Sequence, residues 1–149
     1  MLGALGLAAG LVVIVVVMHL AGLAVLLTLI RRSGSDDRPR HPIAQAGLIV
    51  LVVLALFGVH ALEICVFALA YFGLGEVATL EAAVYFSATS FSTLGYGDVV
   101  IAPPWRLIAA VEGLIGFLMI GWSTAFLVSV IGRLRALEAD WFDRPATRE

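Results

Sequence analysis

One short polar run carries the clearest chemistry of the sequence: Thr93-Leu94-Gly95-Tyr96-Gly97-Asp98. Glycine at alternate positions permits backbone conformations that L-residues rarely adopt, so successive carbonyl oxygens of the run can point the same way. Carbonyl oxygens arranged in this way can replace the hydration shell of a dehydrated cation. One strand of carbonyls cannot surround an ion, whereas four strands about a symmetry axis can. The run therefore predicts a cation filter shared by several copies of the chain.

The segment before this run predicts a short helix at residues 81–92, with Thr79 as its N-cap. About 12 residues are too few to cross a bilayer, which takes roughly 20. The C-terminal end of such a helix carries partial negative charge, which would compensate a cation for its lost water at the membrane centre. Asp98 would form an outer ring of carboxylates that concentrates cations. These are the parts of a cation-selective pore.

Long apolar segments surround these parts and must position them. The 149-residue chain is 62% hydrophobic and 13% charged, against about 45–50% and about 25% for a soluble domain. This composition indicates a multi-pass protein of the lipid bilayer and excludes a soluble enzyme. We expect an all-α membrane protein with three transmembrane helices, a re-entrant pore helix and a filter loop. The predicted segments are an N-terminal span (1–30), a loop (31–42), an outer helix (43–72), the pore helix (81–92), the filter (93–98), an inner helix (105–131) and a tail (132–149).

The charges are sorted along the chain. All nine basic residues are arginines: Arg31, Arg32, Arg38, Arg40, Arg106, Arg133, Arg135, Arg144 and Arg148. Eight of them fall in the first loop and the tail, and residues 73–104 contain none. The positive-inside rule then places loop and tail in the cytoplasm, and the N-terminus and residues 73–104 outside. The formal charge of −2 offers no positive excess for a nucleic acid.

The run at Thr93–Asp98 resembles the filter pattern Thr-Val-Gly-Tyr-Gly-Asp of the tetrameric potassium channels. The resemblance covers about residues 43–131 and is nearest to the small prokaryotic members with two pore-lining helices. It does not cover the first span. It implies a homotetramer in the cell membrane that conducts K⁺ passively, with K⁺ held at Thr93, Leu94, Gly95 and Tyr96 and no further cofactor. Tyr96 favours potassium over the less selective relatives.

The sequence departs from that family in the filter and behind it. Leu94 stands where the family has Val or Ile, so its side chain must pack differently. Tyr85, Phe86 and Thr89 hold the places where family members often have a tryptophan pair and a buried acid. Asp98 therefore loses its usual partner. We expect a filter that is less rigidly clamped and prone to inactivation.

Glycines interrupt the predicted inner helix at Gly113, Gly116 and Gly121. Glycine weakens a helix by about 1 kcal/mol relative to alanine, so a bend there would be easy and could open the cytoplasmic end. Close helix packing of the small-xxx-small type is the alternative. Gly116 and Gly121 are the better hinge candidates.

Four ionisable side chains lie within the predicted spans: His19, His60, Glu63 and Glu112. His60 and Glu63 share one helix face and make either a structural interhelical contact or a pH-sensing pair, since histidine titrates near neutrality. For Glu112 the simpler interpretation is a structural bond behind the pore helix, with Arg106 as a candidate partner. A metal site at His60, Glu63 and Glu112 would need ligands that the sequence does not reveal.

Two other functions remain open on the sequence alone: a weakly selective cation channel and a non-conducting accessory or scaffold subunit. The first span lacks the spaced arginines of a voltage sensor, so we expect it to pack against the outer helix and face lipid. Residues 133–142 can continue the inner helix. An enzyme is disfavoured because no nucleophile–base set and no metal-ligand motif is present. No residue pattern in the sequence identifies a gating stimulus or a regulatory partner of the tail.

Overall fold

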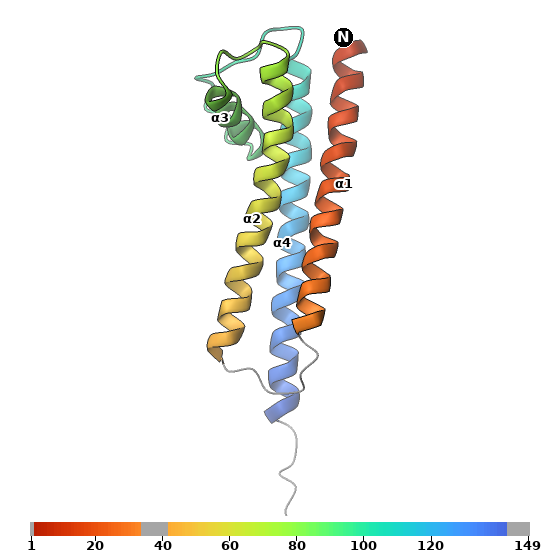
Figure 1. The fold of residues 1–149 in the computed structure, drawn as a ribbon, viewed down its shortest axis with the longest axis vertical. Coiled ribbons are helices and arrows are strands. Elements are labelled where there is room, and N and C mark those ends of the chain that lie inside the picture. The colour runs from red at the N-terminus through yellow and green to blue at the C-terminus, as the bar shows by residue number, and fades with distance from the viewer. Residues whose placement is uncertain (1, 34–41, 143–149) are drawn as a thin grey trace, which may run out of the picture.

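The computed structural model describes residues 2–33 and 42–142, and these residues form four helices and no strand (Figure 1). The helices are α1 (Leu2–Ser33), α2 (Pro42–Gly73), α3 (Leu80–Phe91) and α4 (Arg106–Phe142). Three helices are long and apolar enough to cross a bilayer: Leu2–Arg32, Ile43–Gly73 and Arg106–Arg133. The all-α membrane class is confirmed. Residues 34–41 of the predicted loop and 143–149 of the predicted tail lie outside the described residues.

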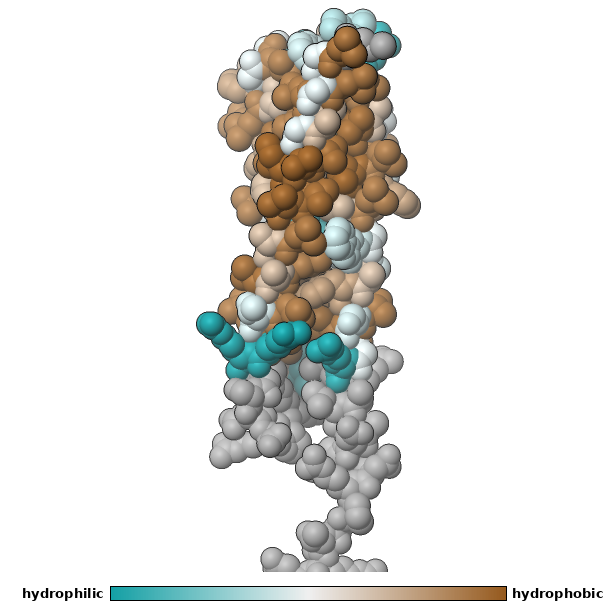
Figure 2. Space-filling view, turned by 90° about the vertical axis from the view of Figure 1, so that its right-hand side faces the viewer, coloured by the Kyte–Doolittle hydropathy of each residue, from teal (hydrophilic) through white to brown (hydrophobic). Residues whose placement is uncertain are grey.

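The three long helices run side by side, and α3 lies beside one end of the bundle (Figure 1). The chain passes down α1, back along α2 and down α4, so the start of α1 shares an end with α3 and the filter loop. Arg31 and Arg32 close the last turn of α1 at the opposite end. Figure 2 shows a broad apolar band between hydrophilic side chains at the two ends. Such a band is what a protein surrounded by lipid tails requires.

Helix α1 packs against both α2 and α4, whereas the sequence predicted only a contact with the outer helix. Its buried face recurs every three or four residues, as the helical period requires: Ala4, Ala8, Leu11, Val15, His19, Leu23 and Leu26. At Gly22 the helices α1 and α2 approach so closely that a Cβ would lie 2.7 Å from Val59 Cγ2. The other face of α1 exposes apolar side chains, as a lipid-facing helix would.

Helix α3 begins at a capped N-terminus and ends against α4. The Thr79 side chain accepts a hydrogen bond from the Ala82 backbone N–H at 3.1 Å, which satisfies one free donor of the first turn. At the other end, a Cβ on Gly116 would overlap the carbonyl oxygen of Phe91 and lie 2.8 Å from its carbonyl carbon. Gly116 therefore lets the C-terminal turn of α3 approach the α4 backbone. Around Gly121 the space within 4 Å is open.

Candidate functional site

The loop after α3 has an alternating backbone. Thr93, Gly95 and Gly97 have positive φ angles of 61°, 53° and 79°. Glycine adopts this region readily, whereas a left-handed threonine costs roughly 1–2 kcal/mol. A β-branched residue held in that region points to a loop whose conformation is fixed by its surroundings. Positive φ at every second residue is the backbone condition on which aligned carbonyls depend.

The start of the loop is fastened to the last turn of α3 by backbone hydrogen bonds. Ser92 N donates to Ala88 O at 3.1 Å, Thr93 N to Ser90 O at 3.0 Å, and Gly95 N to Thr89 O at 3.0 Å. These bonds use carbonyls that a helix end otherwise leaves free. They also direct N–H groups of the loop back toward α3. Residues 93–98 are all exposed in the single chain, with Leu94 61% and Tyr96 68% exposed.

Asp98 has a hydrogen-bond partner on α3. The expectation that Asp98 lacks a partner, drawn from the absence of the family's tryptophan pair and buried acid, is therefore wrong. Tyr85 Oη donates to Asp98 Oδ2 at 2.8 Å, and Val99 N donates to Asp98 Oδ1 at 3.1 Å. The hydrogen bond to Asp98 raises the pKa of the Tyr85 phenol, so the phenol keeps its proton and remains a donor. A phenol therefore clamps the outer end of the loop to α3. The sequence placed Tyr85 on the predicted pore helix but did not show that its hydroxyl would contact Asp98.

Glu112 lies behind α3 and joins three helices. Tyr71 Oη on α2 donates to Glu112 Oε2 at 2.6 Å, and Ser87 Oγ on α3 lies 2.5 Å from Glu112 Oε1. Glu112, Tyr71 and Ser87 are all fully buried. Hydroxyl groups thus take the place that Arg106 was expected to fill. Tyr71 therefore belongs to an interior contact between α2 and α4.

The hydroxyl of Ser87 has one hydrogen and two acceptors. It lies 2.8 Å from the carbonyl oxygen of Ile64 as well as 2.5 Å from Glu112 Oε1. A carbonyl oxygen can only accept, so both contacts are made at once only when the Glu112 carboxyl supplies a second hydrogen. When Glu112 is protonated, its carboxyl can donate to Ser87 Oγ while Ser87 Oγ donates to the carbonyl oxygen of Ile64.

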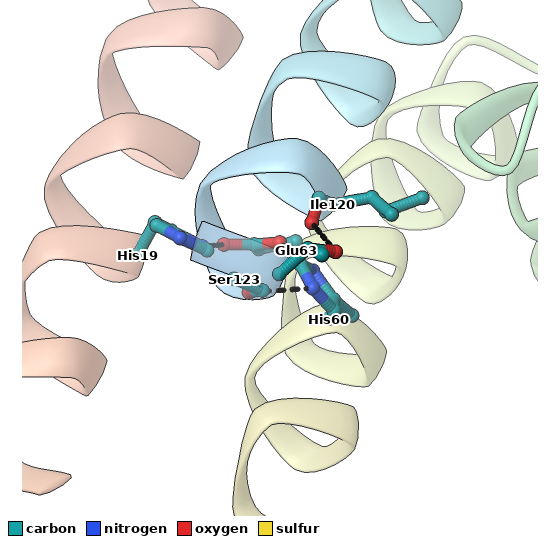
Figure 3. Close-up of polar contacts among 6 residues, drawn as sticks. His19, His60, Glu63, Ile120 and Ser123 are labelled. Atoms are coloured by element: carbon teal, nitrogen blue, oxygen red, sulfur yellow. Dashed lines mark hydrogen bonds and ion pairs between the residues drawn. The ribbon is translucent and has the colours of Figure 1, made fainter. Parts of the chain in front are cut away.

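The remaining buried ionisable groups form a second cluster at mid-bundle (Figure 3). His19 Nδ1 lies 2.9 Å from Glu63 Oε1, and His60 Nδ1 lies 2.7 Å from Glu63 Oε2. His60 Nε2 lies 3.0 Å from Ser123 Oγ on α4. The pair of His60 and Glu63 on one face of α2 was predicted. His19 was singled out without a partner and Ser123 was missed, because a sequence does not show which faces of distant helices meet.

The structure does not bring together the three residues first considered for a metal. Glu112 bonds Tyr71 and Ser87, whereas His60 and Glu63 are joined by His19. The four ionisable residues singled out in the spans thus fall into two places: Glu112 lies behind α3, and the other three lie between α1, α2 and α4. The cluster at Glu112 bonds the helix that carries the loop through Ser87, and the cluster at Glu63 meets the same helix at Phe91, whose ring centroid lies 5.7 Å from that of His60.

Comparison with known proteins gives one match. A family model described as ion channel matches residues 49–133, more than half of the chain. The matched region takes in most of α2, all of α3, the loop and α4 as far as Arg133, and it leaves out α1. No curated protein and no solved structure matches the chain.

Proposed function

The chain belongs to this ion channel family, and from that premise we propose that it is a potassium-selective channel formed by four copies of the chain. K⁺ would pass between the carbonyl oxygens of Thr93, Leu94, Gly95 and Tyr96, with Asp98 at the outer mouth. The observation that carries the proposal is the alternating positive φ of Thr93, Gly95 and Gly97 in a loop fastened to a re-entrant helix. Carbonyls presented in this way suit a dehydrated monovalent cation.

The exposure of the loop supports assembly around an axis. Leu94 and Tyr96 are more than half exposed in the single chain, although they follow a helix that packs against α2 and α4. A single chain surrounds no ion, and fourfold symmetry would place four such loops about one path. The tetramer and its lipid bilayer are therefore the partners that we propose. No cofactor besides the permeant ion is required.

The membrane orientation follows from the charges. We infer a multi-pass protein of the cell membrane with the N-terminus and the filter outside, because α3 and the start of α1 share one end and the arginines of α1 mark the other. The cytoplasmic half of α4 would then hold the gate. Gly121 is the hinge that we propose, since the space around it is open, whereas Gly116 packs against α3.

Flux into liposomes tests the proposal. The purified chain should carry K⁺ that Ba²⁺ blocks, and bi-ionic recordings should show a reversal potential far from zero with K⁺ and Na⁺. Gly95→Ala should abolish the flux because φ is +53° there. Gly10→Ala is the matched control, since a Cβ meets nothing at that exposed position of α1. A reversal potential near zero would indicate a weakly selective cation channel, and no flux at all an accessory subunit.

A further inference from the structure

The cluster of His19, Glu63 and His60 has the composition and spacing of a metal site. One ligand atom from each of the three residues lies within 4.8 Å of the other two. His19 and Glu63 are fully buried, and the His60 side chain is 16% exposed. Figure 3 shows the imidazoles approaching the carboxylate of Glu63 from two helices, with Ser123 on α4 beside His60. The three side chains offer two nitrogen and two oxygen donors.

We infer that this cluster binds a divalent transition-metal ion of the zinc type. Imidazole nitrogen together with carboxylate oxygen suits Zn²⁺ and the later first-row metals, whereas Mg²⁺ and Ca²⁺ prefer oxygen alone. Zinc binds His nitrogen at about 2.0–2.1 Å and carboxylate oxygen at about 2.0–2.2 Å, so neighbouring donors of a tetrahedral site lie roughly 3.3 Å apart. The Nδ1–Oε distances of 2.9 and 2.7 Å are about half an ångström shorter than that spacing. Small side-chain rotations would admit the ion.

The surroundings of the cluster favour a cation. The two partners of Glu63 are imidazoles, so the counter-charge of this buried carboxylate is either a proton on one ring or a bound cation. Ser123 Oγ contacts the far nitrogen of His60 and fixes the orientation of that ring, as outer partners of metal ligands do. His19 Nε2 is buried and has no hydrogen-bond partner among the described residues. Nδ1 of His19, which contacts Glu63, is therefore the ring nitrogen whose hydrogen bond an ion would replace, while Nε2 has no bond within the described part of the chain to lose.

Protons compete with the metal for this site. An Nδ1 that donates to the carboxylate must lose its hydrogen before it binds a metal, and that hydrogen moves to Nε2 of the same ring or leaves to solvent. The groups that face the ring nitrogens and the carboxylate are His19 from α1, His60 and Glu63 from α2, and Ser123 from α4. Trp122 and Phe91 add only aromatic rings, 5.6 Å from His19 and 5.7 Å from His60. Binding should weaken as the pH falls through the range in which histidine gains its proton.

A zinc titration of the purified full chain tests the inference without any measurement of ion flux. Competition with a chromogenic chelator should give one Zn²⁺ per chain, with weaker binding at pH 5.5 than at pH 7.5. Ser123→Ala should weaken binding by roughly 10-fold, the effect of losing an outer partner. His19→Gln and His60→Gln should weaken it further. His41→Gln is the matched control, because His41 is the third histidine and lies outside the described residues.

Three results would overturn the inference. Zinc binding that persists unchanged in the double variant His19→Gln/His60→Gln would place the ion elsewhere, as would an equal loss in His41→Gln. Where a variant fails to fold, Co²⁺ added to the unaltered protein gives an independent reading. Bound Co²⁺ with nitrogen and oxygen ligands in a four-coordinate site should give visible d–d absorption that disappears on acidification. No such absorption would also overturn the inference, whether or not the protein conducts K⁺.

Discussion

Replacing Tyr71 with Phe removes one hydroxyl from the protein interior, and Tyr85→Phe removes one from the outer loop. Both phenols donate to a carboxyl group, Tyr71 to Glu112 at 2.6 Å and Tyr85 to Asp98 at 2.8 Å. The two pairs differ in burial. Tyr71 and Glu112 are fully buried, whereas Tyr85 is 39% exposed and Asp98 is exposed. The two substitutions are therefore matched in chemistry and differ in access to water.

The expected costs follow from this difference. A buried polar atom left without a partner costs about 1–3 kcal/mol, while interhelical hydrogen bonds in membrane proteins reach at most about 1.7 kcal/mol. The Tyr71 ring stays packed edge-on against Phe86 at 5.0 Å between centroids, so its packing is kept. We expect Tyr71→Phe to lower the free energy of unfolding by about 1.5 kcal/mol, which is roughly a tenfold change in the unfolding equilibrium constant. For Tyr85→Phe we expect less than about 0.5 kcal/mol, because water can bond Asp98 instead.

The measurement is reversible unfolding of the purified protein in mixed micelles, monitored by the far-ultraviolet circular dichroism of its helices. A double-mutant cycle of Tyr71→Phe with Glu112→Ala isolates the energy of the pair, because each substitution removes the hydrogen bond. We expect a coupling of about 1 kcal/mol, well above the roughly 0.3–0.5 kcal/mol by which independent sites depart from additivity. The reasoning would be refuted by equal costs for the two tyrosine variants, or by a coupling inside that additive range.

Three further tests use substitutions in α4 and at Tyr85. Gly116→Ala should lower stability by about 1–3 kcal/mol, because its Cβ meets backbone that cannot move aside. Gly121→Ala should raise the thermal midpoint, because its Cβ meets nothing within 4 Å and alanine favours a helix by about 1 kcal/mol over glycine. Equal midpoints for the two variants would contradict this packing. Glu112→Gln should have a thermal midpoint close to that of the unaltered protein, since the glutamine amide supplies the second hydrogen that the contacts of Ser87 require. Glu112→Ala should have a midpoint well below it. Tyr85→Phe should speed the decay of macroscopic current by freeing Asp98, and an unchanged decay would show that this bond does not hold the filter.

The local features of the fold could be predicted from the sequence. Hydropathy over windows of about 20 residues depends only on neighbours in the chain, and it gave the three spans that the structure contains. The short helix after Thr79 could be predicted for the same reason, because its capping residue and its length are local properties. The filter pattern within residues 93–98 is local too, and the family match includes it.

The partners of the buried polar groups could not be predicted in this way. Glu63 meets a histidine 44 positions away, and Glu112 meets a tyrosine 41 positions away. Each contact depends on how two apolar helices are rotated against each other, and apolar side chains on all faces leave that rotation undetermined in the sequence. The expectation of an unpartnered Asp98 failed for the same reason, since the reach of Tyr85 depends on the path of the loop.

These polar groups explain how the helices find their arrangement in lipid. Lipid tails are as apolar as leucine, so burial of apolar surface does not by itself favour one helix neighbour over another. A polar side chain in the hydrocarbon region must find a partner, because leaving it without one is costly. Glu112 selects the faces of α2 and α3 that carry Tyr71 and Ser87, and Glu63 selects the face of α1 that carries His19. Helix α1 lies outside the family match, and two contacts define its place against α2: the bond of His19 to Glu63 and the close approach of Gly22 to Val59.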